Sequence, residues 1–337
     1  MLRKFKVDPI PLQQLLPAAA SARFEGLGYS SSGAVLGAAT ADTNEALLFR
    51  RGPHGRFETA PFCTLSGLKY PHDISFCSSG PLDILAVAQR TGAVSLFAPA
   101  PSGDAYGPSP AFEIAGPESK LIYTDAVAFV PRSDYIAACN LTSSTISFYR
   151  VISRAPLRVE TSPCCELRHA AMRDPDGLAF SSDGAWLATA NHGANSVTIF
   201  RRNPSAEDPL YGPEPIADIK DDDLHYPHSV AFTDAGHLVM TNAGANYVKV
   251  YRLTSTGSER RLVVEPVLKM AVNDQATFEE VNSQNKMEGG PKGLAIHGNE
   301  LAVCSPEFGI KIYQFHEHTL LGRFARFIPR SSAAAHW

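Results

Sequence analysis

The sequence lacks long hydrophobic runs, and no apolar stretch approaches the ~20 residues that a membrane-spanning helix needs. It also lacks a dominant charge: 30 Lys and Arg oppose 34 Asp and Glu, which gives a net charge of −4. Nothing in this balance favours binding to nucleic acid or to an anionic membrane. No Cys-x-x-Cys pair occurs among the six cysteines, which argues against structural zinc and fits a reducing cytoplasm. Gly-x-Ser-x-Gly and phosphate-binding glycine loops are absent as well.

The N-terminal segment, residues 1–21, has basic residues followed by Leu and Ala, as in a secretory signal peptide. A signal peptide needs a continuous apolar region of about 7–15 residues, but Asp8, Gln13 and Gln14 interrupt this one. We therefore expect a cytoplasmic protein, with secretion as the alternative. The segment Lys4 to Val7 is predicted to be an edge strand that pairs with the end of the chain.

What the sequence contains instead is a repeat. The stretch "DPDGLAFSSDGAWLATANHGANSVTIF" from Asp174 has five near-copies along the chain. Aligned on the residue before the first apolar run, the copies follow one another after 47, 53, 51, 52 and 64 residues. These six copies cover residues 22–328 and leave a short tail, 329–337. Evenly spread repeats predict one domain rather than two.

Each copy follows the same local pattern. A short apolar run ends in a turn such as Ser-Ser-Asp-Gly, a second run follows, and a third alternates apolar and polar residues. A weaker fourth run completes the unit; in the last copy it is Leu320 to Phe327. Four strands in a repeat of about 40–50 residues form a β-propeller blade. The prediction is an all-β, six-bladed propeller, with seven blades as the alternative. The side chains expected to be buried between blades are Phe180, Leu187, Val197, Ile199, Phe200, Phe232, Leu238, Val248, Val250 and Tyr251.

The residue before each innermost strand should lie at one mouth of the central channel. These six blade-start residues are Glu25, His72, Asp125, Asp176, His228 and Lys292. All are ionisable, and all except Lys are good ligands for a divalent metal ion. In a six-fold disc blades 2 and 5 are opposite, so the two Tyr-Pro-His sequences that end at His72 and His228 should face each other. Around the ring we expect ligand-binding loop residues, namely Gln89, Arg90, Asn140, Asn191, His192, Asn242 and Glu307, together with Lys292 of the ring.

Two interpretations of this ring stay open. In the first, it holds a metal ion, and His72, Asp125 and His228 act in catalysis. In the second, it is a solvated polar rim or a pocket for a non-catalytic ligand. A polar insertion before the last copy, Asn273 to Gly290, lies on the same side and is either a lid over the site or a surface loop.

The repeat resembles those of the YVTN, lactonase-like and NHL propeller families. The residues that carry the resemblance are Pro175, Gly177, Leu178, Ala179, Phe180, Asp183, Gly184, Leu187, Ala190, Asn191, Asn195, Ser196, Val197, Ile199 and Phe200. With its predicted six blades, the chain resembles the NHL and gluconolactonase/senescence-marker groups most. The latter resemblance implies a divalent metal held by Glu before Gly and by Asn and Asp at later blade starts. In this sequence Glu25 matches, while Asp176 and His228 stand at the Asn and Asp positions.

Two functions follow as expectations. The first is a binding propeller that presents its channel mouth to a small molecule or a peptide. The second is a metal-dependent hydrolase of lactones or related esters. In the second, Glu25, Asp176 and His228 would hold one calcium, manganese or zinc ion.

Overall fold

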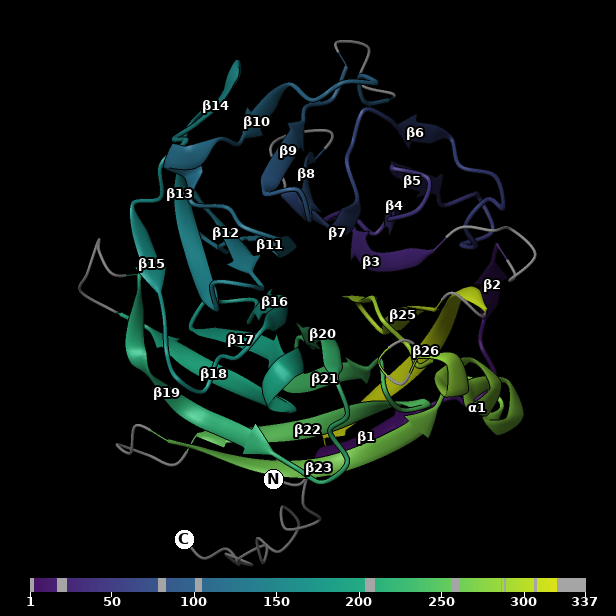
Figure 1. The fold of residues 1–337 in the computed structure, drawn as a ribbon. Coiled ribbons are helices and arrows are strands. Elements are labelled where there is room, and N and C mark those ends of the chain that lie inside the picture. Colours follow the sequence, from purple (N-terminus) through teal and green to yellow (C-terminus); the bar gives the residue numbers. More distant parts are fainter. Residues whose placement is uncertain are drawn as a thin grey trace, which may run out of the picture.

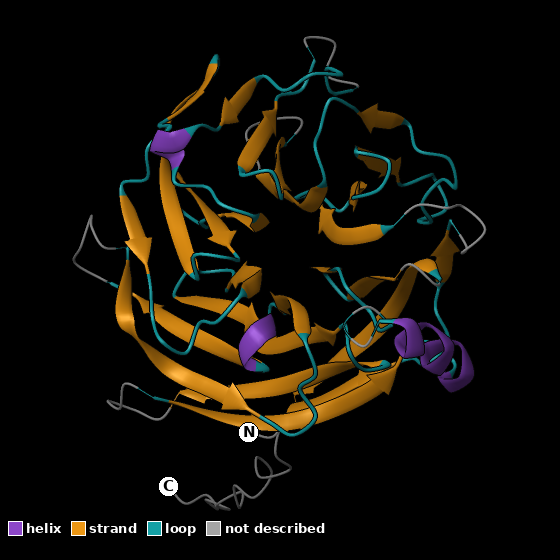
Figure 2. Cartoon of the chain, in the orientation of Figure 1, coloured by secondary structure: helices purple, strands orange, loops and turns teal. Residues whose placement is uncertain are grey.

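Six short antiparallel sheets surround a central axis in the computed structural model, which confirms the six-bladed β-propeller (Figure 1). The structure describes residues 3–16, 23–77, 83–100, 105–203, 210–255, 261–285, 287, 289–305 and 308–319. Strands dominate, and the few helical segments are short (Figure 2). Within these residues no helix is both long enough and apolar enough to span a membrane.

Blades 1 to 3 come first along the chain, and the strands of each follow one another from the channel outward. Blade 1 contains β3 (Phe24–Tyr29), β4 (Val35–Thr40), β5 (Glu45–Arg50) and β6 (Cys63–Leu65). Blade 2 contains β7 (Pro71–Cys77), β8 (Ile84–Gln89), β9 (Ala93–Phe97) and β10 (Phe112–Ile114). Blade 3 contains β11 (Thr124–Phe129), β12 (Tyr135–Asn140), β13 (Thr145–Arg154) and β15 (Cys165–Leu167), and β14 (Leu157–Val159) pairs with the far end of β13. A 3-10 turn, η1 (Pro117–Ser119), precedes blade 3.

Blades 4 to 6 complete the disc. Blade 4 contains β16 (Pro175–Phe180), β17 (Trp186–Asn191), β18 (Ser196–Arg202) and β19 (Tyr211–Lys220), with η2 (His192–Ala194) in its loop. Blade 5 contains β20 (Pro227–Phe232), β21 (His237–Asn242), β22 (Tyr247–Ser255) and β23 (Leu262–Ala271). Blade 6 contains β24 (Leu294–His297), β25 (Glu300–Ser305) and β26 (Gly309–Thr319).

The N-terminal segment supplies the outer strand of blade 6. β1 (Arg3–Val7) pairs antiparallel with β26 from Arg3↔Thr319 to Val7↔Phe315, and β2 (Gln13–Leu15) pairs with an earlier part of β26. First and last parts of the chain therefore share one sheet, which closes the ring. The predicted fourth run of the last repeat, Leu320 to Phe327, lies outside the described residues, as does the tail 329–337.

The hydrophobic core is divided into six clusters, one at each interface between neighbouring blades. Eight of the ten side chains expected there are buried: Leu187, Val197, Ile199, Phe200, Leu238, Val248, Val250 and Tyr251. The expectation was wrong for Phe180 and Phe232, which are only half-buried. Both stand at the last position of an innermost strand, where the blade interface opens onto the disc's other face.

The insertion before blade 6 is partly helical rather than irregular. α1 (Gln275–Gln284) begins after Asp274, whose side chain accepts the backbone N–H of Thr277 as an N-cap. Phe278 is its buried residue. Figure 1 shows α1 at the edge of the disc, beside β26 and away from the axis. A lid role for the insertion stays a prediction.

Candidate functional site

A β-bulge places the blade-start residue in five of the six blades. The pairing of the innermost strand with its neighbour shifts register at this residue in blades 1 to 5. A bulged residue is left out of the ladder, so its side chain can be re-aimed. Five blades therefore use the same local device to direct an ionisable side chain toward the channel.

The residue after the blade start is small in most blades because the next innermost strand passes close by. A Cβ added at Gly26 would lie 2.5 Å from the carbonyl oxygen of His72, and one at Gly293 would lie 2.6 Å from that of Glu25. Gly177 abuts the carbonyl of His228 in the same way. These close approaches draw the innermost strands together and bring their first side chains into contact.

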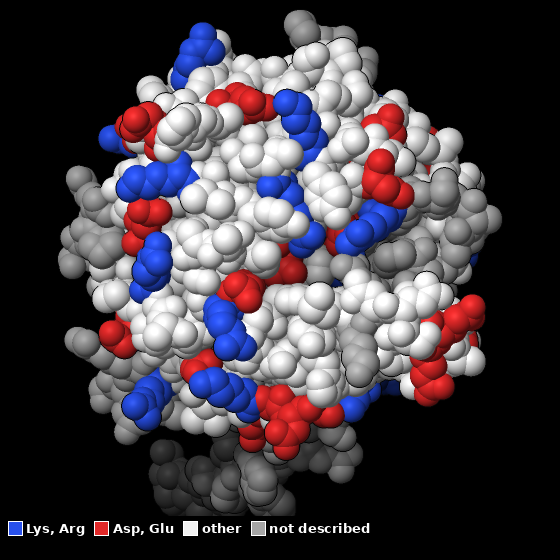
Figure 3. Space-filling model, viewed as in Figure 1, with Lys and Arg blue, Asp and Glu red and all other residues white. Residues whose placement is uncertain are grey.

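The six blade-start side chains form one buried cluster. The most exposed of them, His228, keeps 6% of its surface, and Lys292 keeps 1%. The imidazoles of His72 and His228 stack with ring centroids 5.1 Å apart, which confirms that the two Tyr-Pro-His sequences face each other. The cluster is therefore not a solvated rim. Figure 3 shows acidic and basic side chains meeting near the middle of this face.

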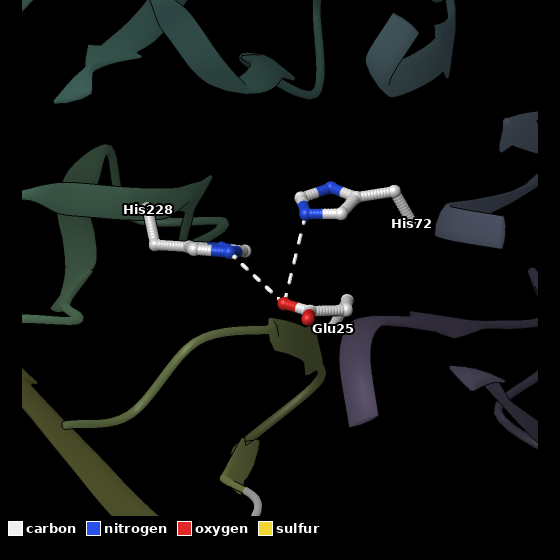
Figure 4. Close-up of side chains that lie close together, drawn as sticks. All are labelled: Glu25, His72 and His228. Atoms are coloured by element: carbon white, nitrogen blue, oxygen red, sulfur yellow. Dashed lines mark ion pairs between the residues drawn. The ribbon is translucent and has the colours of Figure 1, made fainter. Parts of the chain in front are cut away.

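Glu25 is the centre of the cluster's contacts. Lys292 Nζ donates to both of its oxygens at 3.1 and 2.9 Å, and Arg23 Nε lies 2.5 Å from Oε1. The Nε2 atoms of His72 and His228 lie 3.6 and 3.4 Å from Oε2 (Figure 4). Burial by itself would raise the pKa of Glu25, but Lys292 and the two imidazoles outweigh it and hold this pKa well below its usual range. Glu25 is thus ionised at neutral pH.

Asp125 has a fixed cation of its own. Arg90 binds it through two parallel hydrogen bonds, from Nε at 2.7 Å and from Nη2 at 3.0 Å. Burial nevertheless raises the pKa of Asp125 to about 6, because Arg90 offsets the desolvation only in part. Two of the three ring carboxylates are therefore already paired with protein cations.

Asp176 lacks such a partner among the described residues. Its Oδ1 is buried without a hydrogen bond and lies 3.8 Å from His72 Nδ1, and its Oδ2 lies 3.8 Å from His228 Nε2. Burial, and then the nearby Asp125 carboxylate, raises the pKa of Asp176 well above its ordinary value. Among the described residues no Lys or Arg forms an ion pair with Asp176, although the positive charges of Arg90 and Lys292 lower its pKa in part.

The hydrogen bonding of His72 fixes its tautomer. Its Nδ1 lies 3.0 Å from the carbonyl oxygen of Asp125, which can only accept, so Nδ1 carries the proton. Burial, and then Arg90, lowers the pKa of His72 well below its usual value, so the ring is neutral. Its Nε2 therefore presents a lone pair, buried and without a donor, toward the Glu25 carboxylate. Burial likewise lowers the pKa of His228, although Glu25 opposes this.

Sequence reasoning missed two charged members of the site. Asp73 follows His72 and lines the same cavity; its carboxylate accepts the backbone N–H of Val127 at 3.1 Å. Burial raises the pKa of Asp73 to about 7. The aligned repeats held a signal, because the other blades have Gly, Ala or Ser after the blade start. Arg23, the second missed residue, stands two positions before the first blade start, Glu25.

The predicted loop residues do not all point into the channel. Four amides are buried and bonded within their own blades, where their roles as ligand contacts stay predictions: Gln89, Asn140, Asn191 and Asn242. Three of them accept the backbone N–H of the residue three positions before the blade start, at Lys69, Ile122 and His225. They brace the chain as it enters the innermost strand. Glu307 lies outside the described residues.

Aromatic side chains surround the mouth above the ring. The Arg90 guanidinium lies 5.6 Å from the ring of Tyr70 and 5.1 Å from that of Tyr123, and His192 lies 4.9 Å from Tyr226. All three tyrosines stand two positions before a blade start and have φ of 50–54°. Such backbone is costly for a bulky residue and is found most often at functional sites.

The geometry brings together two groups of side chains that could hold a metal ion in the described part of the chain. One contains Glu25, His72 and His228, and the other contains His72, Asp125 and Asp176; in each, the ligand atoms lie within 4.8 Å of one another. The structure thus joins Glu25 and His228 of the expected metal set with His72. A cavity of about 10 Å³ lies among these residues, which is close to the space that one water molecule needs.

No protein-family model and no curated protein matches the chain.

Proposed function

We propose that this protein is a ligand-binding propeller whose blade-start ring holds one divalent metal ion at the mouth of the channel. The observation that carries the proposal is the buried lone pair of His72 Nε2, 3.6 Å from a carboxylate oxygen and without a donor. Two electron-rich atoms facing each other in a buried site repel unless a cation or a donor lies between them.

The ligand set fits such an ion. His72 donates its other ring N–H to a backbone carbonyl, the arrangement that orients metal-binding histidines in proteins. Ligand atoms on one tetrahedral zinc ion lie about 3.4 Å apart, given Zn–N distances of about 2.0–2.1 Å. The separations of Glu25 Oε2 from His228 Nε2 and His72 Nε2, 3.4 and 3.6 Å, are close to this value.

Two imidazoles and one carboxylate favour zinc or manganese over calcium, which prefers oxygen ligands. Glu25, His72 and His228 would hold the ion, with Asp176 beside them. Titration of EDTA-treated, dialysed protein with zinc, manganese and calcium by calorimetry tests this. We expect one site per chain that is lost in His72→Ala and kept in His54→Ala, an exposed control. Absence of a stoichiometric site for all three ions would refute the proposal.

A second candidate is a metal-dependent hydrolase of lactones or related esters, as in the gluconolactonase group that the repeat resembles. The observation that favours it is Asp176, a carboxylate beside the ligand group with a raised pKa and no protein cation bonded to it in the described chain. When bound, a divalent ion would supply carbonyl polarisation and a water of lowered pKa. Asp176, whose carboxylate oxygens lie 3.8 Å from His72 Nδ1 and from His228 Nε2, would then be the candidate general base.

Hydrolysis of a small lactone and of a phenyl ester, measured with and without metal, tests the second candidate. We expect Asp176→Asn to lower turnover by at least ~10²-fold, the ordinary contribution of a general base, while metal still binds. Asp234→Asn, an exposed substitution in blade 5, is the matched control. Equal turnover in Asp176→Asn and in the wild type would eliminate this candidate.

A further inference from the structure

Two cysteines stand next to each other where the outer strand of blade 3 begins. Cys165 is the first residue of β15, and Cys164 comes directly before it. Neighbouring side chains on a strand ordinarily point to opposite faces. Here the two sulfur atoms lie 4.0 Å apart, and both side chains pack against the hydrophobic cluster between blades 3 and 4. The chain therefore presents two thiols together, as a pair.

Local hydrogen bonds hold the pair in this arrangement. The backbone N–H of Cys164 donates to the carbonyl oxygen of Phe148 at 2.8 Å. The Cys164 thiol lies 3.4 Å from the same oxygen and donates to it. Cys165 stands opposite Phe148 in the pairing of β15 with β13. Both sulfurs are thus positioned from one residue of the neighbouring strand.

A cavity opens beside the pair at the edge of the disc. It has a volume of about 200 Å³ and lies between β15 and the start of β19 (Figure 1), with Cys165, Leu167 and Tyr211 among its lining residues. One water molecule needs only about 10–15 Å³. Both cysteines are half-buried rather than fully enclosed. An ion can therefore reach the sulfur of Cys165 through this cavity.

We propose that Cys164 and Cys165 form a second metal site, independent of the ring, that binds one Cu(I) ion through two thiolates. Thiolates are protein ligands that select soft ions such as Cu(I). A metal–sulfur bond is about 2.3 Å long, so two sulfurs on one ion lie between about 3.8 Å, at a tetrahedral angle, and about 4.6 Å, in a line. The separation of 4.0 Å between the two sulfurs falls in this range.

The number of ligands favours Cu(I) over zinc. Among the described residues, no histidine, cysteine, aspartate or glutamate joins these sulfurs in a group of three ligand atoms within 4.8 Å of one another. Structural zinc takes four protein ligands, whereas two thiolates suffice for Cu(I). Binding releases both thiol protons and leaves a complex with one negative charge. Arg168 lines the cavity and offsets this charge, while Glu166 beside it pairs with Lys120 at 3.1 Å.

Anaerobic titration of the reduced protein with Cu(I), in competition with the colorimetric chelator bicinchoninate, tests the site. We expect one ion per chain, bound at least ~10²-fold more weakly by Cys164→Ser and by Cys165→Ser, because each variant loses the gain that comes from two linked ligands. Cys63→Ser, which changes another half-buried cysteine, should bind the ion as the wild type does. His72→Ala, which alters the ring, should also keep this ion.

A second measurement uses the unaltered protein and covers the case in which a serine variant does not fold. Phenylarsine oxide condenses with two neighbouring thiols: two As–S bonds form, the As=O oxygen takes both thiol protons and leaves as water, and nothing is oxidised or reduced. We expect one adduct per native chain, found after trypsin digestion in the peptide of residues 159–168, and loss of Cu(I) binding in that adduct. No adduct or an adduct elsewhere, or a Cu(I) affinity that is unchanged in the adduct or in either serine variant, would overturn the inference.

Discussion

Lys292 offers a direct test of the charge balance in the ring, through the substitution Lys292→Met. The change keeps most of the side-chain volume and removes the ammonium that donates to both Glu25 oxygens. Both side chains are buried, with exposed fractions of 2% and 0%. Removing one partner of a buried ion pair costs about 3–5 kcal/mol, because the other charge is left uncompensated. Arg23 still contacts Glu25, so we expect about 3 kcal/mol.

Urea unfolding of metal-free protein at neutral pH measures this cost. The double variant Glu25→Gln/Lys292→Met removes both charges and should recover at least half of the loss. Lys120→Met is the control: this lysine pairs with Glu166 at the surface with 58% of its side chain exposed, and its loss should cost less than about 0.5 kcal/mol.

The same variant also tests the metal site. Zinc would replace the missing positive charge beside Glu25, so it should stabilise Lys292→Met more than it stabilises the wild type. At a free zinc concentration of 100 times Kd, linkage alone gives about 2.7 kcal/mol. A loss below about 1 kcal/mol in the single variant, or a double variant no more stable than the single, would refute the role of Lys292 as the counter-ion of Glu25.

Three further predictions concern the fold and the missed carboxylate. Phe200→Ala should destabilise the protein by about 3–5 kcal/mol and Phe180→Ala by clearly less, because only Phe200 is fully buried; equal losses in urea unfolding would contradict this. Gly177→Ala should also destabilise it, since the new Cβ would clash with the His228 backbone, and a neutral result would show that the strands can separate. Burial raises the pKa of Asp73 to about 7, so the folded wild type binds a proton more tightly than the unfolded chain and loses stability as pH rises from about 4 to 7. Asp73→Asn has no such carboxylate, so its free energy of unfolding should rise relative to that of the wild type by about 1–3 kcal/mol between pH 5 and pH 8. A difference in free energy of unfolding that does not change with pH would contradict the raised pKa.

The architecture could be predicted from the sequence because each blade repeats the same local pattern. Turn residues, short apolar runs and one alternating run mark three strands in every copy, and the count of copies predicts six blades. The repeat also explains why one alignment column identified all six ring residues. Equivalent positions in a rotationally repeated fold come to equivalent places around one axis.

Features that depend on several blades at once could not be read from one copy. The ring looked like a solvated rim because ionisable residues at a strand start are ordinarily exposed, yet the close approach of neighbouring innermost strands buries it. The pairing of Lys292 with Glu25 joins residues 267 positions apart in the chain. Phe180 looked like core because its run is apolar, but burial there depends on how far the neighbouring blade extends. The local pattern thus identified the ring residues. Which residues contact one another could be seen only in the closed ring.

Closure of the ring is itself a condition for the site. His72 and His228 belong to blades 2 and 5. These blades are three steps apart, which is half a turn only in a ring of six blades. Their rings stack 5.1 Å apart, and both direct Nε2 toward Glu25. The sixth blade is completed by β1, whose pairing with β26 joins the two ends of the described chain. A seventh blade would rotate these two histidines out of opposition and widen the channel between them. The edge strand from Arg3 to Val7 therefore acts on the site at a distance, because it holds the blade count that brings the two imidazoles and the carboxylate together.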